Sequence, residues 1–179
     1  MNGRSFINNS NIGLYARLVA ERKKRERVGL SKWIAHGVAA VRVWSRYDRR
    51  LRVTLRGKGM DRRARTPFVF VGNNEYQLSG VELGGRRRLT GGCLHVCMAP
   101  GMTRAGVVRM IVAAVFGRIH TIHGFESFIA TEFTLDAGRR RLEVSLDGEV
   151  VIMANPLEYC IRPSVLRVIV PAAIPTEES

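Results

Sequence analysis

The spacing of hydrophobic residues changes at Leu51, and this change constrains the fold more than any other feature of the sequence. From Leu51 onward, apolar residues alternate with polar ones or form short runs, which glycine, asparagine or proline separates. A period of two is typical of half-buried strands. The pattern predicts strands at residues 51–55, 67–71, 94–99, 126–135, 140–146, 149–153, 157–161 and 165–170, after an earlier strand at 5–10. So many short strands indicate an antiparallel sandwich or barrel.

Three helices are expected beside these strands. In the first helix, apolar residues at helical spacing precede a charged run, and Gly29 ends the helix. The third begins at Thr103, a capping residue, and ends at Gly117. The second starts near Ser31 and places five residues on one stripe: Trp33, Ile34, Gly37, Val41 and Trp44. This helix is amphipathic and basic, which suits a membrane interface, but aromatic stripes at this spacing are more often part of a core.

The positive charge of the chain is concentrated in its first 65 residues. This part holds 18 Lys or Arg against 4 Asp or Glu, whereas residues 66–179 hold 11 of each, so the net charge of +14 belongs to the first part. Such a region can bind nucleic acid, anionic lipid headgroups or nucleotide phosphates, or can be a solvated face. Its aromatic residues, Trp33, Trp44 and Tyr47, argue against nucleic acid, because they follow a core-facing stripe and a stacking surface should be exposed.

Length and hydropathy indicate a single domain. A chain of 179 residues can bury one core but not two full-sized ones, and we expect the domain to cover residues 1–172, with a frayed tail at 173–179. The first residues lack the pattern of a secretory signal. The longest apolar run, Ala105 to Phe116, falls short of the roughly 20 residues that span a bilayer. A cytoplasmic location is therefore expected.

Three cysteines, Cys93, Cys97 and Cys160, cannot all pair within the chain, which also suits a reducing compartment. In a strand, Cys93, His95 and Cys97 share one face, a pattern that raises the question of a metal. Side chains two apart on a strand splay outward, and no fourth ligand converges on them. The interpretation favoured here is two half-buried thiols beside a hydrogen-bonded histidine, with no metal.

Two alternating runs meet at Asp147-Gly148. Asp-Gly is a usual dipeptide of a two-residue hairpin turn in which both residues have positive φ. Alternatively, Asp147 presents a carboxylate at the rim of the sheet, supported by Glu149, and accepts a proton from an attacking hydroxyl, as a base does in phosphoryl transfer. Spacing alone does not decide between turn and base. No glycine pattern here is typical of a phosphate-binding loop, so the sequence indicates no ATP-binding site.

Several short motifs follow one another in order. They are Phe6 to Leu14, a basic helix, Gly29 to Trp33, Thr66 to Asn74, Leu146 to Glu149, and a last strand between Pro163 and Pro171. This order, over nearly the whole chain, resembles the carboxy-terminal domain of the diacylglycerol kinase family, which sphingosine kinases and bacterial lipid kinases share. No single motif is specific, and the order and spacing carry the resemblance.

The resemblance implies a mainly β fold, a two-sheet antiparallel β-sandwich with two or three helices at one end. It further implies the substrate-binding half of an ATP-dependent lipid kinase that phosphorylates diacylglycerol or a related lipid. In that family, the lipid binds between this domain and a nucleotide-binding domain. Asp147 takes the place of the catalytic base, with Glu149 beside it. The implied partners are the lipid, the amino-terminal nucleotide-binding domain and an anionic membrane surface, with the protein peripherally associated with that membrane.

Two departures from the family limit these expectations. The Gly-Gly-Asp-Gly-Thr nucleotide signature of the amino-terminal domain is missing, so Mg and ATP belong to the complete enzyme and this chain alone is expected to bind neither and to be inactive. Relatives often carry an acidic pair that helps to hold a structural metal ion, where Thr90 and Gly91 stand here. No metal is therefore expected. The alternative function is a basic module without catalysis that binds anionic membrane or, less favoured, nucleic acid.

Overall fold

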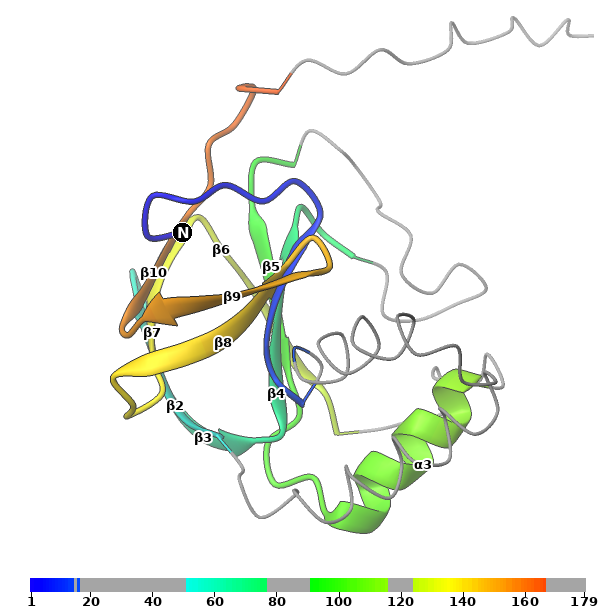
Figure 1. Ribbon diagram of the computed structural model, residues 1–179. Helices are drawn as coiled ribbons and strands as arrows, with labels where there is room; N and C mark the ends of the chain where they lie inside the picture. The colour runs from blue at the N-terminus through cyan, green and yellow to red at the C-terminus, as the bar shows by residue number, and fades with distance from the viewer. Residues whose placement is uncertain (15, 17–50, 77–90, 116–123, 167–179) are drawn as a thin grey trace, which may run out of the picture.

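The computed structural model describes residues 1–14, 16, 51–76, 91–115 and 124–166, and within them the chain forms two antiparallel sheets (Figure 1). The larger sheet has the strand order β6-β5-β4-β1-β8-β9, and the smaller has the order β10-β7-β2-β3. The strands of the larger sheet are β1 (Asn9–Gly13), β4 (Phe68–Asn73), β5 (Leu94–Met98), β6 (Glu126–Ala130), β8 (Arg141–Leu146) and β9 (Glu149–Ala154). Those of the smaller sheet are β2 (Leu51–Gly57), β3 (Met60–Thr66), β7 (Glu132–Asp136) and β10 (Leu157–Cys160).

The hydrophobic core lies between the two sheets, as in a β-sandwich. Every second residue of β2, namely Leu51, Val53 and Leu55, is buried, and the residues between them are more exposed. The central strands of the larger sheet contribute every second residue to the same core. The largest fully buried side chains of this core are Ile12, Val53, Leu55, Val69, Val71, Leu94, Val96, Met98, Leu135, Leu157 and Tyr159. The predicted sandwich architecture is therefore confirmed.

One strand, β3, is absent from the sequence prediction. Its residues Met60–Thr66 include Asp61 and three arginines, so the run lacks the apolar alternation by which strands are recognised. Only Met60, Ala64 and Thr66 on its inward face touch or enter the core. Because β3 is an edge strand of the smaller sheet, its other residues face solvent and can be charged.

The predicted strand at 126–135 is wrong in one respect, since it is two strands in different sheets. Glu126–Ala130 pairs with β5 in the larger sheet, and Glu132–Asp136 pairs with β2 and β10 in the smaller one. The core-facing residues change from even positions, such as Phe128, to odd positions, such as Phe133. The alternation therefore shifts by one residue at Thr131, where the chain crosses between the sheets.

The first strand was predicted at residues 5–10, but β1 begins at Asn9 and ends at Gly13. Residues 7 and 8 precede the strand, and their backbone N–H groups bind the side chain of Asp147 instead of a neighbouring strand. Gly13 has a φ of 89°, and a Cβ there would lie 2.5 Å from the carbonyl oxygen of Pro67. Only glycine fits at this end of β1.

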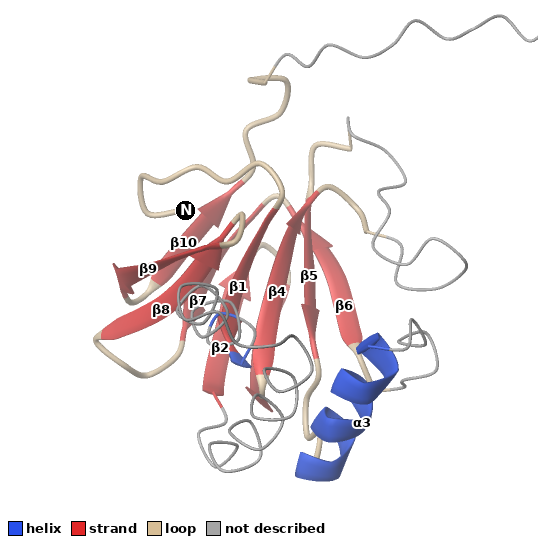
Figure 2. Cartoon of the chain, turned by 45° about the vertical axis from the view of Figure 1, so that its right-hand side comes forward, coloured by secondary structure: helices blue, strands red, loops and turns tan. Residues whose placement is uncertain are grey.

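One helix lies within the described residues. It is α3 (Arg104–Val115), beside the ends of β5 and β6 in Figure 2, and it matches the helix expected from Thr103 to Gly117. The Thr103 hydroxyl caps it by accepting a hydrogen bond from the Gly106 N–H at 3.1 Å. The two other expected helices fall almost entirely outside the described residues, so the expected number of two or three is not confirmed. In the part of the chain that the structure describes, no helix has the length and apolarity to cross a membrane.

The structure describes only the first two residues of the last predicted strand. Val165 and Leu166 are not in a strand, contrary to the prediction of one at 165–170, and their exposure is 71% and 57%. The rest of that segment and the expected tail at 173–179 lie outside the described residues.

Candidate functional site

The turn between β8 and β9 has positive φ at both central residues, 46° at Asp147 and 84° at Gly148. This confirms the two-residue hairpin predicted from the Asp-Gly dipeptide. The register of β8 and β9 is continuous up to the turn, with Leu146 opposite Glu149. The hairpin therefore holds Asp147 at the rim of the larger sheet, where its side chain is exposed.

The Asp147 carboxylate binds the backbone of three consecutive residues, Ile7, Asn8 and Asn9, called here the asparagine segment. The Ile7 N–H donates to Oδ2 at 2.7 Å, and the N–H groups of Asn8 and Asn9 donate to Oδ1 at 2.7 and 2.9 Å. In return, the Asp147 N–H donates to the Asn9 carbonyl oxygen at 2.9 Å. Successive N–H groups that converge on one acceptor form an anion-binding arrangement. The segment therefore holds the carboxylate in a single orientation.

The asparagine segment is also held from the side of β4. The Asn73 N–H donates to the Asn8 carbonyl oxygen at 3.0 Å, and Asn73 Nδ2 donates to the Ile7 carbonyl oxygen at 2.9 Å. The Tyr76 hydroxyl lies 2.6 Å from Asn8 Oδ1 and 3.0 Å from the Asn8 carbonyl oxygen. Three chain regions that are distant in sequence thus meet at the rim of the larger sheet.

Local packing fixes the position of Tyr76. Its ring meets Phe70 edge-on, with ring centroids 5.1 Å apart. A Cβ at Gly72 would lie 2.4 Å from carbon atoms of the Tyr76 ring, so glycine allows the ring to lie directly against β4. The backbone N–H of Tyr76 donates to His95 Nδ1 at 3.0 Å.

His95 is thus hydrogen-bonded, as the sequence interpretation expected, and accepts through Nδ1 as a neutral imidazole. Burial lowers the pKa of His95, and the nearby Glu75 opposes this effect. Burial raises the pKa of the Cys97 thiol to about 11, so this cysteine is not a thiolate near neutral pH. Among the described residues, no group of three or more His, Cys, Asp or Glu is arranged to hold a metal ion.

Glu149 is the first residue of β9 and is exposed. It lies on the same hairpin as Asp147, so the structure places both predicted site residues at one end of the sheet. On the neighbouring strand, Asn11 Nδ2 donates to Asn9 Oδ1 at 2.7 Å, and Asn11 lies opposite Ser145. Polar residues of β1 and β8 therefore extend from the Asp147 turn along the larger sheet.

Asn8, Asn73 and Tyr76 were not predicted as site residues. The sequence did contain a signal for two of them, since Asn8 and Asn73 each belong to a pair of consecutive asparagines beside a strand. Nothing local to Tyr76 indicates that its hydroxyl reaches a residue 68 positions away.

The two-sheet fold belongs to a known class of β-sandwich domains. Residues 12–170 match the family described as the YegS C-terminal NAD kinase beta sandwich-like domain. Because the match covers most of the chain, the protein belongs to this family. The resemblance to the carboxy-terminal domain of diacylglycerol kinase-like lipid kinases is thereby confirmed.

Solved structures agree with this assignment at the level of the fold. One provisionally assigned diacylglycerol kinase from Bacillus anthracis str. Sterne superimposes with a TM-score of 0.54 and 18% identity, covering 88% of this chain and 50% of that one. A second structure with the same provisional assignment, from the same organism, has a TM-score of 0.52 and 17% identity, covering 86% and 50%. The chain therefore spans about half the length of these relatives.

Proposed function

We propose that this chain is the lipid-substrate half of an ATP-dependent lipid kinase, and that Asp147 is its catalytic base. The observation that carries the proposal is the Asp147 carboxylate at the rim of the sheet, held by three backbone N–H groups within a domain of the lipid kinase family. A base must present its lone pair in a fixed direction before substrate arrives. The asparagine segment supplies that constraint.

The arrangement leaves capacity for one further hydrogen bond. A carboxylate has about four lone-pair positions. The described residues use two on Oδ1 and one on Oδ2, which leaves the second position of Oδ2 for a substrate hydroxyl. In the proposed reaction, that hydroxyl oxygen forms a bond to the γ-phosphorus as the bond to the departing ADP breaks, and its proton passes to Asp147. Glu149, at the start of β9, supports the site at the same rim.

The nucleotide is proposed to come from another domain. The relatives are about twice as long as the matched region, and the sequence has no phosphate-cradling loop. Mg-ATP would supply the transferable phosphoryl group from that domain. The substrate class proposed is a lipid with a free hydroxyl, such as diacylglycerol.

The test is phosphorylation in trans. The chain is mixed with the nucleotide-binding half of a related diacylglycerol kinase, Mg-ATP and a short-chain diacylglycerol dissolved as monomers. Formation of the phosphorylated lipid should require both halves. If the two halves associate and bind ATP but form no lipid phosphate from any acylglycerol, the proposed function is wrong.

A further inference from the structure

The edge of the smaller sheet carries a group of exposed arginines. Arg52 of β2 lies directly opposite Arg65 of β3, and Arg63 lies opposite Thr54, one pair further along the same face. Arg62 extends from the other face of β3, and all four side chains are exposed. These four residues, Arg52, Arg62, Arg63 and Arg65, are called here the basic edge.

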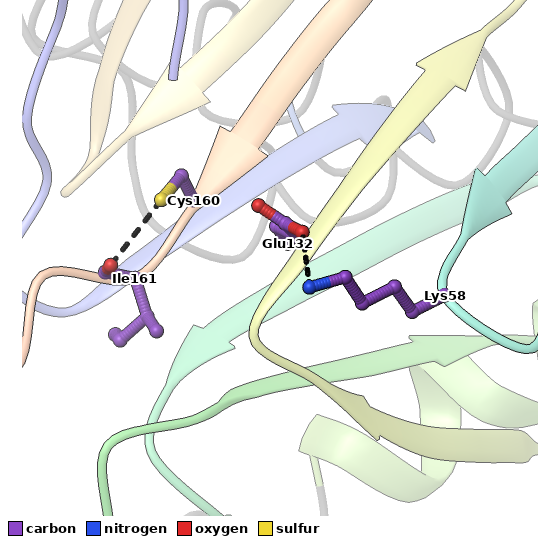
Figure 3. A network of polar contacts seen from close by, with 4 residues as sticks. All are labelled: Lys58, Glu132, Cys160 and Ile161. Carbon is purple, nitrogen blue, oxygen red and sulfur yellow. Dashed lines mark hydrogen bonds and ion pairs between the residues drawn. The ribbon is translucent and has the colours of Figure 1, made fainter.

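Two neighbouring cations, Lys58 and Arg56, lie near acidic residues of the protein itself. Lys58, in the turn between β2 and β3, forms an ion pair with Glu132, with Nζ 3.5 Å from Oε1 (Figure 3). Arg56 lies opposite Asp61 and also helps to lower the pKa of Asp136, after larger effects of hydrogen bonds from Asn155 and Gly138. The four guanidinium groups of the basic edge make no ion pair with any residue in the described ranges.

Placing Arg52 opposite Arg65 costs stability. Directly opposed residues on antiparallel strands have Cβ atoms about 5 Å apart, and like charges there repel each other. A charged edge strand does protect a sheet from pairing with another chain, but alternating signs would protect it without this repulsion. The arrangement therefore points to an external anion that offsets it.

We propose that the basic edge is the surface by which the protein docks on an anionic membrane, with the edge of the smaller sheet against the lipid headgroups. Arginine suits this role because its planar guanidinium binds phosphate in a bidentate manner. Each cation near an anionic bilayer adds to the attraction, and several together suffice for reversible binding. The choice of a membrane rests on the proposed function, since a kinase of diacylglycerol must reach substrate that resides in a bilayer.

The other half of the smaller sheet, β7 and β10, is less suited to contact with anionic lipid headgroups. This half carries Glu132 and Asp136 on β7 and Glu158 on β10, all exposed and without an arginine among those two strands. Glu132 is paired with Lys58, but this half has no arginine of its own and carries the further carboxylates of Asp136 and Glu158, so it attracts an anionic surface less than the basic edge does. Neither β2 nor β3 has an aromatic residue, so the edge offers no platform on which a nucleic acid base could stack.

The test measures binding of the whole chain to vesicles by co-sedimentation. Vesicles of phosphatidylcholine alone are compared with vesicles that also contain phosphatidylglycerol. The double variant Arg52→Gln/Arg65→Gln should bind the anionic vesicles more weakly by about fivefold for each arginine removed. The matched control, Arg139→Gln/Arg140→Gln, removes the same charge from the turn before β8 and should bind almost as well as the unmodified chain. Thermal unfolding checks that both variants fold.

Three outcomes would overturn the proposal: an equal loss in the control pair, binding that ignores phosphatidylglycerol, or binding of single-stranded RNA in preference to vesicles. The proposed function is examined separately. In the trans assay, the Arg52→Gln/Arg65→Gln variant should phosphorylate monomeric short-chain diacylglycerol at the normal rate. Loss of vesicle binding with a normal phosphorylation rate would support the docking role of the basic edge. Absence of phosphorylation with the unmodified chain would contradict the kinase function alone.

Discussion

The Asp147 turn and the basic edge are both exposed and charged, yet they differ in how their charges are satisfied. The Asp147 carboxylate accepts three backbone hydrogen bonds from the asparagine segment. Arg52 and Arg65 lie opposite each other, and neither pairs with a carboxylate in the described ranges. The fold compensates the negative charge of Asp147 with hydrogen bonds, but within the part of the chain that the structure describes it leaves the positive charges of Arg52 and Arg65 uncompensated.

This difference matches the two roles proposed for these regions. A charge that the backbone holds is positioned for a reaction that requires exact orientation. A cluster of like charges that the protein leaves unbalanced suits a partner without fixed geometry, such as a fluid membrane surface. Removing the first should lower both stability and the rate of the chemical step, whereas removing the second should lower neither.

The largest expected effect comes from Asp147→Asn in the assembled kinase. Loss of a general base should lower lipid phosphorylation by about 10²- to 10⁴-fold. Stability should also fall, by about 1 kcal/mol, because an amide group in place of Oδ2 would face the Ile7 N–H. Turnover and denaturant unfolding of the variant measure both effects. Glu149→Gln is the control on the same hairpin and should lose much less activity, and equal losses in the two variants would refute the assignment of the base.

Tyr76→Phe should reduce stability by about 1 kcal/mol, because the hydroxyl that binds Asn8 is lost while the ring stays beside Phe70. The asparagine segment should also become less ordered. Hydrogen exchange at the N–H groups of Ile7, Asn8 and Asn9 reports this directly. Unchanged exchange would mean that Asp147 and Asn73 hold the segment without Tyr76.

Acid should destabilise the chain through His95. Its pKa is lowered in the folded state by burial, so the unfolded chain binds a proton more readily. The stabilising contribution is complete above the unfolded pKa of about 6.5 and is lost as the pH falls through the lower folded value. Denaturant unfolding between neutral and mildly acidic pH measures it. In His95→Gln this part of the pH dependence should vanish, and a curve unchanged by the substitution would contradict the prediction.

The smallest effect is expected at the basic edge. Arg65→Gln removes the repulsion with Arg52 and should leave stability unchanged or raise it by about 0.5 kcal/mol at low salt. Salt screens exposed charges, so the gain should disappear at high ionic strength. A clear loss of stability in thermal unfolding would show that Arg65 has a structural role instead.

The sequence predicted most strands because their apolar residues alternate around a core, as in Leu51, Val53 and Leu55. It failed where a strand has little contact with that core, as in β3, and where the alternation shifts between two sheets at Thr131. Both failures come from the assembly of the sheets, since an edge position and a crossing point are defined only once strands are paired.

The candidate site was predictable only in part. The Asp-Gly dipeptide indicated the turn, and the family resemblance drew attention to Asp147 and Glu149. Neither indicated that the asparagine segment would bind the carboxylate, because Ile7 and Asp147 are 140 residues apart. The basic edge was hidden for a related reason, since the opposition of Arg52 and Arg65 depends on the register of β2 and β3.

One crossed measurement separates the proposed role of Asp147 from that of the basic edge. The rate of lipid phosphorylation in trans is determined for monomeric short-chain diacylglycerol and for diacylglycerol in anionic vesicles, with the unmodified chain, Asp147→Asn and Arg52→Gln/Arg65→Gln. Asp147→Asn should lose activity on both substrates, and the arginine variant should lose activity on vesicles only. If Asp147→Asn retains full activity on the monomeric substrate, or if the arginine variant loses activity on both substrates equally, the proposed division of roles between the two regions is wrong.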